Sequence, residues 1–241
     1  MMRLLFFATT VWLITGCKED ASHPLGTVHF DVAYLVDGIP LSFDTIQYVS
    51  EAGNQYGISR MEYYISALAF LKSGAPLYES GNVQYVSAKA GSTNSFSLDA
   101  VPVGNYDCIT FLIGLNSAKN VTNELPNTIE NINMAWPDAM GGGYHFMKYE
   151  GHFLDSLGRE MGFAMHLGEN ANVVEIKITG LDISVAENAT VDIALTMNLN
   201  EWFKNPSVFD FNADGNYTMG VAAAMQKLAV NGKDVFSATV Q

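Results

Sequence analysis

The chain has 241 residues, a formal net charge of −13 and a charged fraction of only 15%. An acidic chain is electrostatically unsuited to nucleic acid or to an anionic membrane surface, so neither is an expected partner. The length, with a hydrophobic fraction of 49%, allows one large domain with a sizeable core.

The N-terminus has the pattern of a secretory signal. Arg3 supplies positive charge, and the apolar run Leu4 to Ile14 is too short to be a permanent membrane span. Next comes Leu13-Ile-Thr-Gly-Cys17, which resembles a bacterial lipobox and predicts cleavage before Cys17 and acylation of that residue. The following Lys18-Glu-Asp20 resembles an export signal of surface-exposed lipoproteins.

These features predict an outer-membrane lipoprotein in the cell envelope of a diderm bacterium, facing the periplasm or the cell surface. We expect residues 1–16 to be the signal peptide, residues 17–27 a lipidated polar tether, and residues 28–241 the folded domain. A lipidated Cys17 leaves Cys108 as the other cysteine, which excludes an intramolecular disulfide. Cys108 lies in an apolar stretch and is expected to be a small buried residue.

Short stretches rich in β-formers recur along the domain and are separated by clusters of Gly, Asn, Asp and Pro, a pattern that predicts strands. Val221 to Val230 is the one stretch where a helix competes. We expect an all-β, single-domain β-sandwich with long loops. The expected strands are 28–36, 59–71, 83–88, 95–98, 105–114, 143–153, 161–167, 172–179 and 190–198.

The segment Met134 to Phe153 gathers a tryptophan, two histidines, three methionines and a triple glycine. Imidazole and thioether groups suit soft and borderline metals such as copper, so any chemistry is expected here. Strand alternation sends His145 to one face and His152 to the other, together with Lys148 and Glu150. The two histidines should therefore not share an ion unless the strand bulges, which Gly151 would permit.

A further candidate ligand, His166, lies on the next predicted strand. Asp155-Ser-Leu-Gly158 predicts a turn, so Met161 to Gly168 should return antiparallel beside the first strand. This pairing would place His166 near Lys148 and within a residue or two of Met147 or His145. The register decides which face His166 shares, and both possibilities remain open.

The stretch from Asp210 to Asn216 matches the first half of a calcium loop. Oxygen-bearing Asp210, Asn212 and Asp214 alternate, and Gly215 stands at the sixth position. The twelfth position is Val221, where a calcium loop needs a glutamate. We therefore favour a tight Asx turn over a calcium site.

Catalytic motifs are missing from the sequence, which shows no nucleophile elbow, phosphate loop or His-Glu-x-x-His helix, so we expect no enzyme. Glu150 and Glu160 could form the carboxylate pair of a glycosidase, the weakest alternative. A stronger alternative is a metal-free surface module that binds glycans or proteins. Its aromatic platform would be Tyr63, Tyr64 or Trp202.

An ordered series of segments resembles the MbnP-like copper-binding proteins. The series spans most of residues 28–200 and keeps the order of the family. Its members are Val36-Asp-Gly-Ile-Pro-Leu41, Gly57-Ile-Ser-Arg-Met-Glu-Tyr-Tyr-Ile-Ser66, Val101-Pro-Val-Gly-Asn-Tyr106, Phe111-Leu-Ile-Gly-Leu-Asn116, the segment around Trp136, Gly143-Tyr-His-Phe-Met-Lys-Tyr-Glu-Gly151 and Met165-His-Leu-Gly168.

This resemblance implies a β-sandwich that binds copper through histidines, with a tryptophan oxidised to kynurenine. It also implies a partner, a di-haem cytochrome of the MbnH or cytochrome c peroxidase kind, that performs the oxidation. Carried onto this chain, Trp136 becomes the residue to be oxidised, His166 and His145 the metal ligands, and His152 a weaker candidate. Members often carry two tryptophans before Gly-Tyr, whereas this chain has Trp136 alone, with Trp202 as the other tryptophan of the mature chain.

Overall fold

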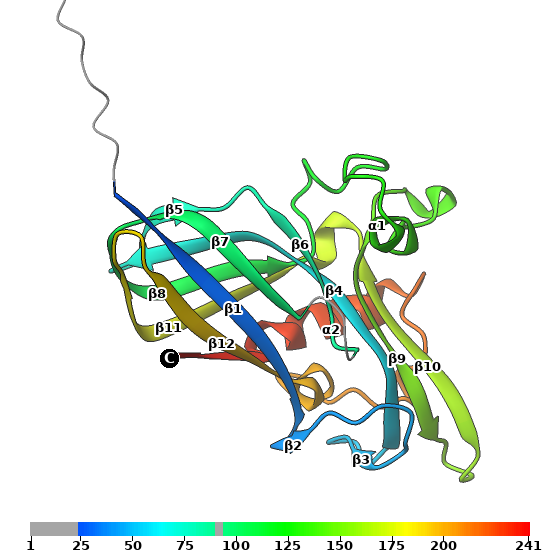
Figure 1. Ribbon diagram of the computed structural model, residues 1–241. Coiled ribbons are helices and arrows are strands. Elements are labelled where there is room, and N and C mark those ends of the chain that lie inside the picture. Colours follow the sequence, from blue (N-terminus) through cyan, green and yellow to red (C-terminus); the bar gives the residue numbers. More distant parts are fainter. Residues whose placement is uncertain (1–23, 90–93) are drawn as a thin grey trace, which may run out of the picture.

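Two β-sheets form the body of the molecule (Figure 1). The computed structural model describes residues 24–89 and 94–241. The first sheet runs β13 (Phe236–Val240), β12 (Thr190–Asn198), β1 (Leu25–Val36) and β2 (Ile39–Pro40), with β7 (Ser95–Pro102) also paired to β1. The second runs β10 (Glu160–Gly168), β9 (His145–Leu154), β4 (Gln55–Lys72), β8 (Gly104–Ile113) and β11 (Val174–Val185). The short strands β3 (Tyr48–Val49), β5 (Ala75–Glu79) and β6 (Val83–Ser87) pair with β4.

Helical segments occupy the connections. They are α1 (Ile129–Asn133), α2 (Ala222–Asn231) and the 3-10 turns η1 (Asp138–Met140), η2 (Asn170–Asn172), η3 (Leu199–Phe203) and η4 (Gly232–Asp234). The predicted all-β sandwich is confirmed.

The long strand β4 joins the two halves of the second sheet. Residues 56–63 pair with β9, and residues 65–71 pair with β8. The ladder to β8 breaks between Ser66 and Ala69, and within that break Ala67 has a φ of 49°, in the left-handed region. Such a break bends a strand. The β9–β10 hairpin therefore diverges from the β8–β11 half, as Figure 1 shows.

The core follows from alternation along the strands. In β1, Val28, Phe30 and Val32 are buried while the residues between them are more exposed, as expected for a strand with one face on the core. Buried side chains from both sheets form one continuous apolar cluster. The first strand begins at Leu25 rather than Val28, because residues 25–27 already pair with β7 or β12.

Each predicted strand has a counterpart in the structure, and Val221 to Val230 forms a helix, α2. Strands β2, β3, β5 and β13 were not anticipated. Buried Cys108 is confirmed as a small core residue. Within the described part of the chain, no helix has the length and apolar character to cross a membrane. The expected signal peptide, Cys17 and the Lys18-Glu-Asp20 signal lie outside the described residues.

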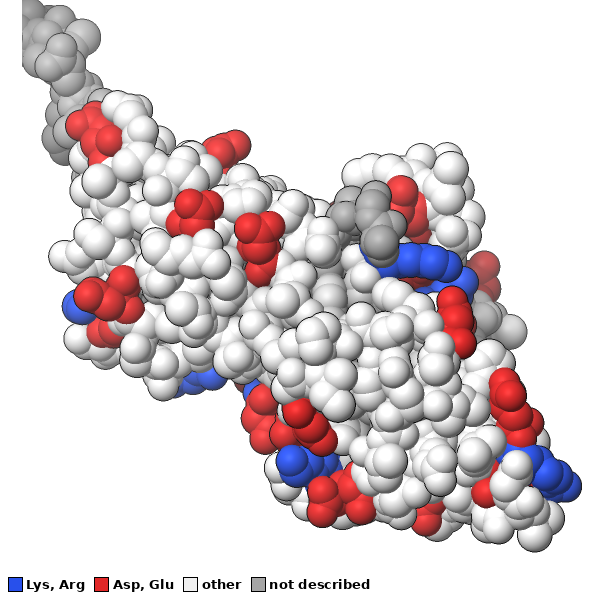
Figure 2. All heavy atoms as spheres, turned by 60° about the horizontal axis from the view of Figure 1, so that its bottom comes forward, with Lys and Arg blue, Asp and Glu red and all other residues white. Residues whose placement is uncertain are grey.

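Charged side chains are sparse on the surface. Figure 2 shows one face on which wide areas carry neither acidic nor basic groups. On this face, the charged groups are separated by wide uncharged areas.

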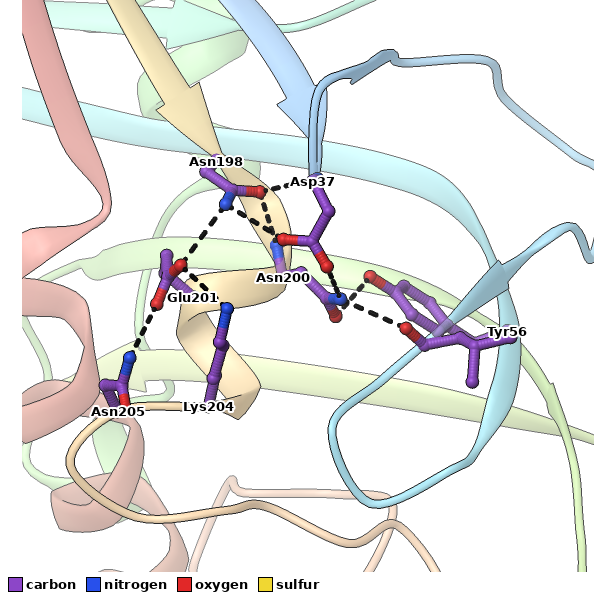
Figure 3. A network of polar contacts seen from close by, with 8 residues as sticks. Asp37, Tyr56, Asn198, Asn200, Glu201, Lys204 and Asn205 are labelled. Atoms are coloured by element: carbon purple, nitrogen blue, oxygen red, sulfur yellow. Dashed lines mark hydrogen bonds and ion pairs between the residues drawn. The ribbon is translucent and has the colours of Figure 1, made fainter.

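A polar network around Asn200 ties the two sheets together at one end (Figure 3). The Asn200 amide nitrogen donates to the Asp37 carboxylate at 2.6 Å and to the Val49 carbonyl at 3.0 Å. Its amide oxygen accepts from the Tyr56 hydroxyl at 3.1 Å. Asn200 and Tyr56 are both buried, so each of these bonds satisfies a group that water cannot reach.

The Asn200→Ala substitution is expected to lower the free energy of unfolding by about 3 kcal/mol, because it removes these bonds and leaves the Tyr56 hydroxyl unpaired. Chemical denaturation measures the change. Adding Tyr56→Phe to Asn200→Ala should recover part of the loss, since the orphaned hydroxyl is gone. A stability within about 0.5 kcal/mol of the parent protein for Asn200→Ala would contradict this role.

Candidate metal centre

Trp136 lies on the connection between α1 and η1, which folds back against the start of β9. An isolated antiparallel bridge joins Ala135 to Tyr144, and the Trp136 amide donates to the Gly143 carbonyl at 2.9 Å. The indole Nε1–H donates to the Met140 carbonyl at 3.2 Å, and the side chain is 2% exposed. The tryptophan is therefore fixed beside the first residue of β9.

A β-bulge decides the direction in which His145 points. In the β9–β10 ladder Lys148 pairs with His166 and Met147 with Leu167, but Gly168 then pairs with His145. Phe146 is therefore an extra residue in β9. The expectation from simple alternation, that His145 lies on the face opposite Lys148, is corrected by this bulge, which falls at Phe146 and not at Gly151.

The bulge brings three rings from distant positions into one row. The ring centroids of Trp136 and His145 are 4.7 Å apart, and those of His145 and His166 are 5.0 Å apart. His145 and Trp136 are buried, whereas the His166 side chain is 15% exposed, so the row runs from the interior toward the surface. Two imidazoles and an indole thus meet where β9 begins and β10 ends, close to α1 in Figure 1.

The hydrogen bond of His145 fixes its tautomer. Its Nδ1 lies 3.1 Å from the Met134 carbonyl oxygen, an acceptor, so the proton is on Nδ1. The other nitrogen, Nε2, is then unprotonated and carries a lone pair. Burial lowers the pKa of His145 to about 4, and the positive charge of Lys148 acts in the same direction. The imidazole is therefore neutral at physiological pH.

His166 has the complementary arrangement. Its Nε2 lies 2.8 Å from a carboxylate oxygen of Glu150, which also accepts from Arg60 at 3.2 Å. The hydrogen bond from His166 holds the pKa of the Glu150 carboxyl below its usual range. With the proton on Nε2, the lone pair is on Nδ1, which is buried and has no hydrogen-bond partner. A buried nitrogen without a partner is costly and calls for an explanation.

Both histidines have the features of metal ligands. A ligating histidine commonly donates its second ring N–H to a carboxylate or to a backbone carbonyl, and His166 and His145 do one each. Imidazole nitrogen suits copper, zinc, iron and nickel. Among the described residues, no group of three or more His, Cys, Asp or Glu side chains is placed to hold an ion. The centre therefore offers two imidazole nitrogens, one from each ring, that are free of a hydrogen-bond partner within the described part of the protein.

Lys148 attaches β9 to the loop that carries Trp136. Its ammonium donates to the carbonyl of Asn133, the last residue of α1, and burial lowers its pKa. The hydrogen bond from His166 to Glu150 was missed in the sequence, where Glu150 was considered only as one of a carboxylate pair with Glu160. The signal that could have found it is the place of Glu150 on the face of Lys148, the residue that pairs with His166.

His152 is set apart from the other histidines. It is exposed and pairs with Gly162, which on β10 lies roughly 13 Å from His166 at the usual rise per residue. The three-ring row therefore excludes it, and its weaker candidacy as a ligand gains no support from the geometry.

The stretch expected to be an Asx turn is held by protein groups. The Asp210 carboxylate accepts from the Asn212 amide at 2.9 Å and from the Asn54 side chain at 3.0 Å. The Asp214 carboxylate accepts from the Lys227 ammonium at 2.7 Å. These donors use the oxygens that a calcium ion would need, which supports the turn over a calcium site.

The structure also argues against the two alternative sites, the aromatic platform and the glycosidase carboxylate pair. Tyr63, Tyr64 and Trp202 are all buried in the core, so the expected aromatic platform is wrong for these residues. Glu150 pairs with Ala164 and Glu160 with Leu154, which separates their backbones by roughly 13 Å along the ladder. That spacing exceeds the carboxyl separations typical of glycosidases, about 5 to 9.5 Å.

The fold and this centre define a class, a β-sandwich with two neighbouring histidines, one buried and one partly buried, beside a tryptophan. The sequence profile of the MbnP family matches residues 25–220, and the chain belongs to that family. A solved structure, MbnP from Methylosinus trichosporium, superposes with a TM-score of 0.55 at 13% sequence identity. The match covers 90% of this chain and 99% of that chain, and at this identity it shows the fold alone. None of the curated protein sequences matches the chain.

The resemblance identified from the ordered segments is thereby confirmed. Membership of the family supports a methanobactin-related, copper-associated protein.

The metal-free protein is expected to lose stability in mild acid because of His145. The folded state keeps this residue neutral down to about pH 4, whereas the unfolded chain protonates it below about pH 6.5. The contribution of His145 to the free energy of unfolding is complete above pH 6.5. It falls by about 3 kcal/mol as the pH drops to 4. Chemical denaturation across this range should give a steeper loss for the parent protein than for His145→Gln. Parallel curves for the two proteins would contradict the assignment of a neutral, buried His145.

Proposed function

We propose that this chain is a non-enzymatic, copper-binding lipoprotein of the bacterial cell envelope, with His145 and His166 as the metal ligands. The observation that carries the proposal is the pair of neighbouring imidazoles, His145 buried and His166 partly buried, each with one nitrogen committed to a fixed acceptor. Each ring thus keeps one lone pair for an ion. Membership of the MbnP family supports copper as that ion.

The chemistry of the donors favours copper over the hard cations. Calcium and magnesium take oxygen ligands, whereas the row of rings provides nitrogen. A bound copper ion would be a soft ion shielded from bulk water. The protein fixes the tautomers, keeps His145 neutral by burial, and excludes solvent with Trp136.

The His145→Ala and His166→Ala substitutions are each expected to weaken copper binding by about 100-fold or more, since each removes a ligand that its own hydrogen bond had oriented. The matched control is His152→Ala, on the same strand as His145, which should bind as the parent protein does. A competition titration with a chromophoric copper chelator measures the affinity, and metal analysis should give roughly one copper per chain. Parent protein that takes up no copper, or alanine variants of both ligands that bind unchanged, would refute the proposal.

Trp136 is the proposed site of oxidation to kynurenine by a partner di-haem cytochrome of the MbnH type. Its contact with His145 supports this proposal, because a modified Trp136 would lie beside the proposed metal ligands. Trp202, the alternative, is buried beneath Gly232, where an added Cβ would lie 2.4 Å from its ring. The observed ring contacts place Trp136, and not Trp202, next to the histidines.

Protein isolated from its native host is expected to carry a mass increase of roughly 4 Da on the peptide that contains Trp136, by loss of a carbon and gain of an oxygen. Peptide mass spectrometry locates the change, and the Trp136→Phe protein should lack it. Deletion of a neighbouring di-haem cytochrome gene should also abolish it. An unmodified Trp136 in host-derived protein would refute the oxidation without touching the copper proposal.

The same measurement tests the proposed anchor. Acylation of Cys17 would anchor the N-terminal residue of the mature chain in the outer membrane. A mature N-terminus other than Cys17 would refute lipidation.

A further inference from the structure

The outer edge of β10, away from β9, is covered by residues 216–220, which we name the strap. The Ala164 amide donates to the Asn216 carbonyl at 2.8 Å, and the Thr218 amide donates to the Ala164 carbonyl at 3.3 Å. These bonds form a short parallel bridge between Ala164 and Tyr217. The strap thus begins as an added strand on the edge of the strand that carries His166.

The strap stops behaving as a strand at Thr218. In a continuing parallel strand, the Thr218 carbonyl would accept from the His166 amide and a later amide would donate to the His166 carbonyl. Instead, the Thr218 carbonyl accepts from the Val221 amide at 2.8 Å, in the turn that leads into α2. Both backbone groups of His166 would then lack partners.

The hydroxyl of Thr218 replaces both missing partners. It accepts from the His166 amide at 2.7 Å and donates to the His166 carbonyl at 2.6 Å. Thr218 is fully buried, so water cannot substitute for this hydroxyl. The Thr218 side chain thereby forms hydrogen bonds with both backbone polar groups of His166, the candidate ligand.

The far end of the strap reaches the other half of the centre. The methyl of Met140 lies 3.8 Å from the position of a Cβ built on Gly220, and the Met140 carbonyl holds the Trp136 indole. The strap therefore covers the β10 edge behind His166 and ends near the turn that positions Trp136.

We propose that Thr218 is a positioning residue for copper binding, which sets the orientation of His166 from the backbone side. This inference rests on the proposed copper function. The hydrogen bond to Glu150 fixes Nε2 of the His166 ring. The position of the ring is defined only if the backbone of His166 is also fixed. The edge of a sheet is the place where backbone would otherwise be free to shift, and Thr218 supplies the second point of attachment. A ligand held at both ends is preorganised.

The test compares Thr218→Val, which keeps the shape but loses the hydroxyl, with Thr218→Ser, which retains it. Thr218→Val is expected to weaken copper binding by about tenfold or more, in the range found for lost partners of metal ligands, and Thr218→Ser should restore it to within about threefold. If Thr218→Val fails to fold, Thr218→Ala serves in its place. A competition titration with a chromophoric copper chelator measures each affinity.

A matched control separates positioning from general stability. Asn216→Ala removes another bond between the strap and β10, from the Asn216 side chain to the Gly162 carbonyl at 2.7 Å, well away from His166. It should lower the melting temperature, as Thr218→Val does, yet leave the copper affinity unchanged. Equal weakening by Asn216→Ala and Thr218→Val, or unchanged affinity in Thr218→Val, would overturn the proposal.

A second measurement does not depend on copper. Nitrogen-15 NMR of the metal-free protein should show His166 in one tautomer, protonated at Nε2, and a mixture of tautomers in Thr218→Val. Identical His166 signals in the two proteins would also overturn the proposal. If the parent protein bound no copper, the copper function would fail, while the NMR comparison would still decide whether Thr218 positions His166.

Discussion

The bulge at Phe146 is the feature on which the candidate centre depends. Without it, β9 would turn His145 toward the face of Met147, which is buried in the core, and away from His166. The bulge is held by packing. Phe146 is fully buried, and Gly114, at the end of β8 with a φ of 114°, leaves room for it, because a Cβ there would lie 2.5 Å from the Phe146 ring. The packing of Phe146, the residue next to His145, against a glycine distant in the sequence therefore helps to set the geometry of the histidines.

The hairpin then fixes the loop that carries Trp136. β9 reaches this loop through the bond from His145 to the Met134 carbonyl and through the bond from Lys148 to the Asn133 carbonyl. Both acceptors are backbone groups at the end of α1, which would need partners in any case. The same bonds thus pair the free carbonyl groups at the end of α1 and orient the candidate ligand His145. Glu150, held between His166 and Arg60, performs the equivalent task on the side of β10.

Much of the fold could be predicted from the sequence, because alternation and turn residues are local signals. They located the strands and placed His166 near Lys148, its partner in the ladder. The bulge could not be predicted, since it depends on the fit of Phe146 against Gly114, a contact between strands distant in sequence. The hydroxyl bonds of Thr218 were missed for the same reason. The burial of Tyr63 and Tyr64 follows from the central place of β4, which their β-forming character alone does not reveal.

The segment His166-Leu-Gly168 gains a physical explanation from the structure. His166 presents its ring to His145, Leu167 is fully buried in the core, and Gly168 lies against the face of Trp136. A Cβ at Gly168 would lie 2.5 Å from Cε3 of the indole, so a larger residue would displace the tryptophan. The glycine is therefore required by the tryptophan rather than by the turn that follows it. Because Gly168 also pairs with His145 across the bulge, its missing side chain is the common condition for all three rings to meet.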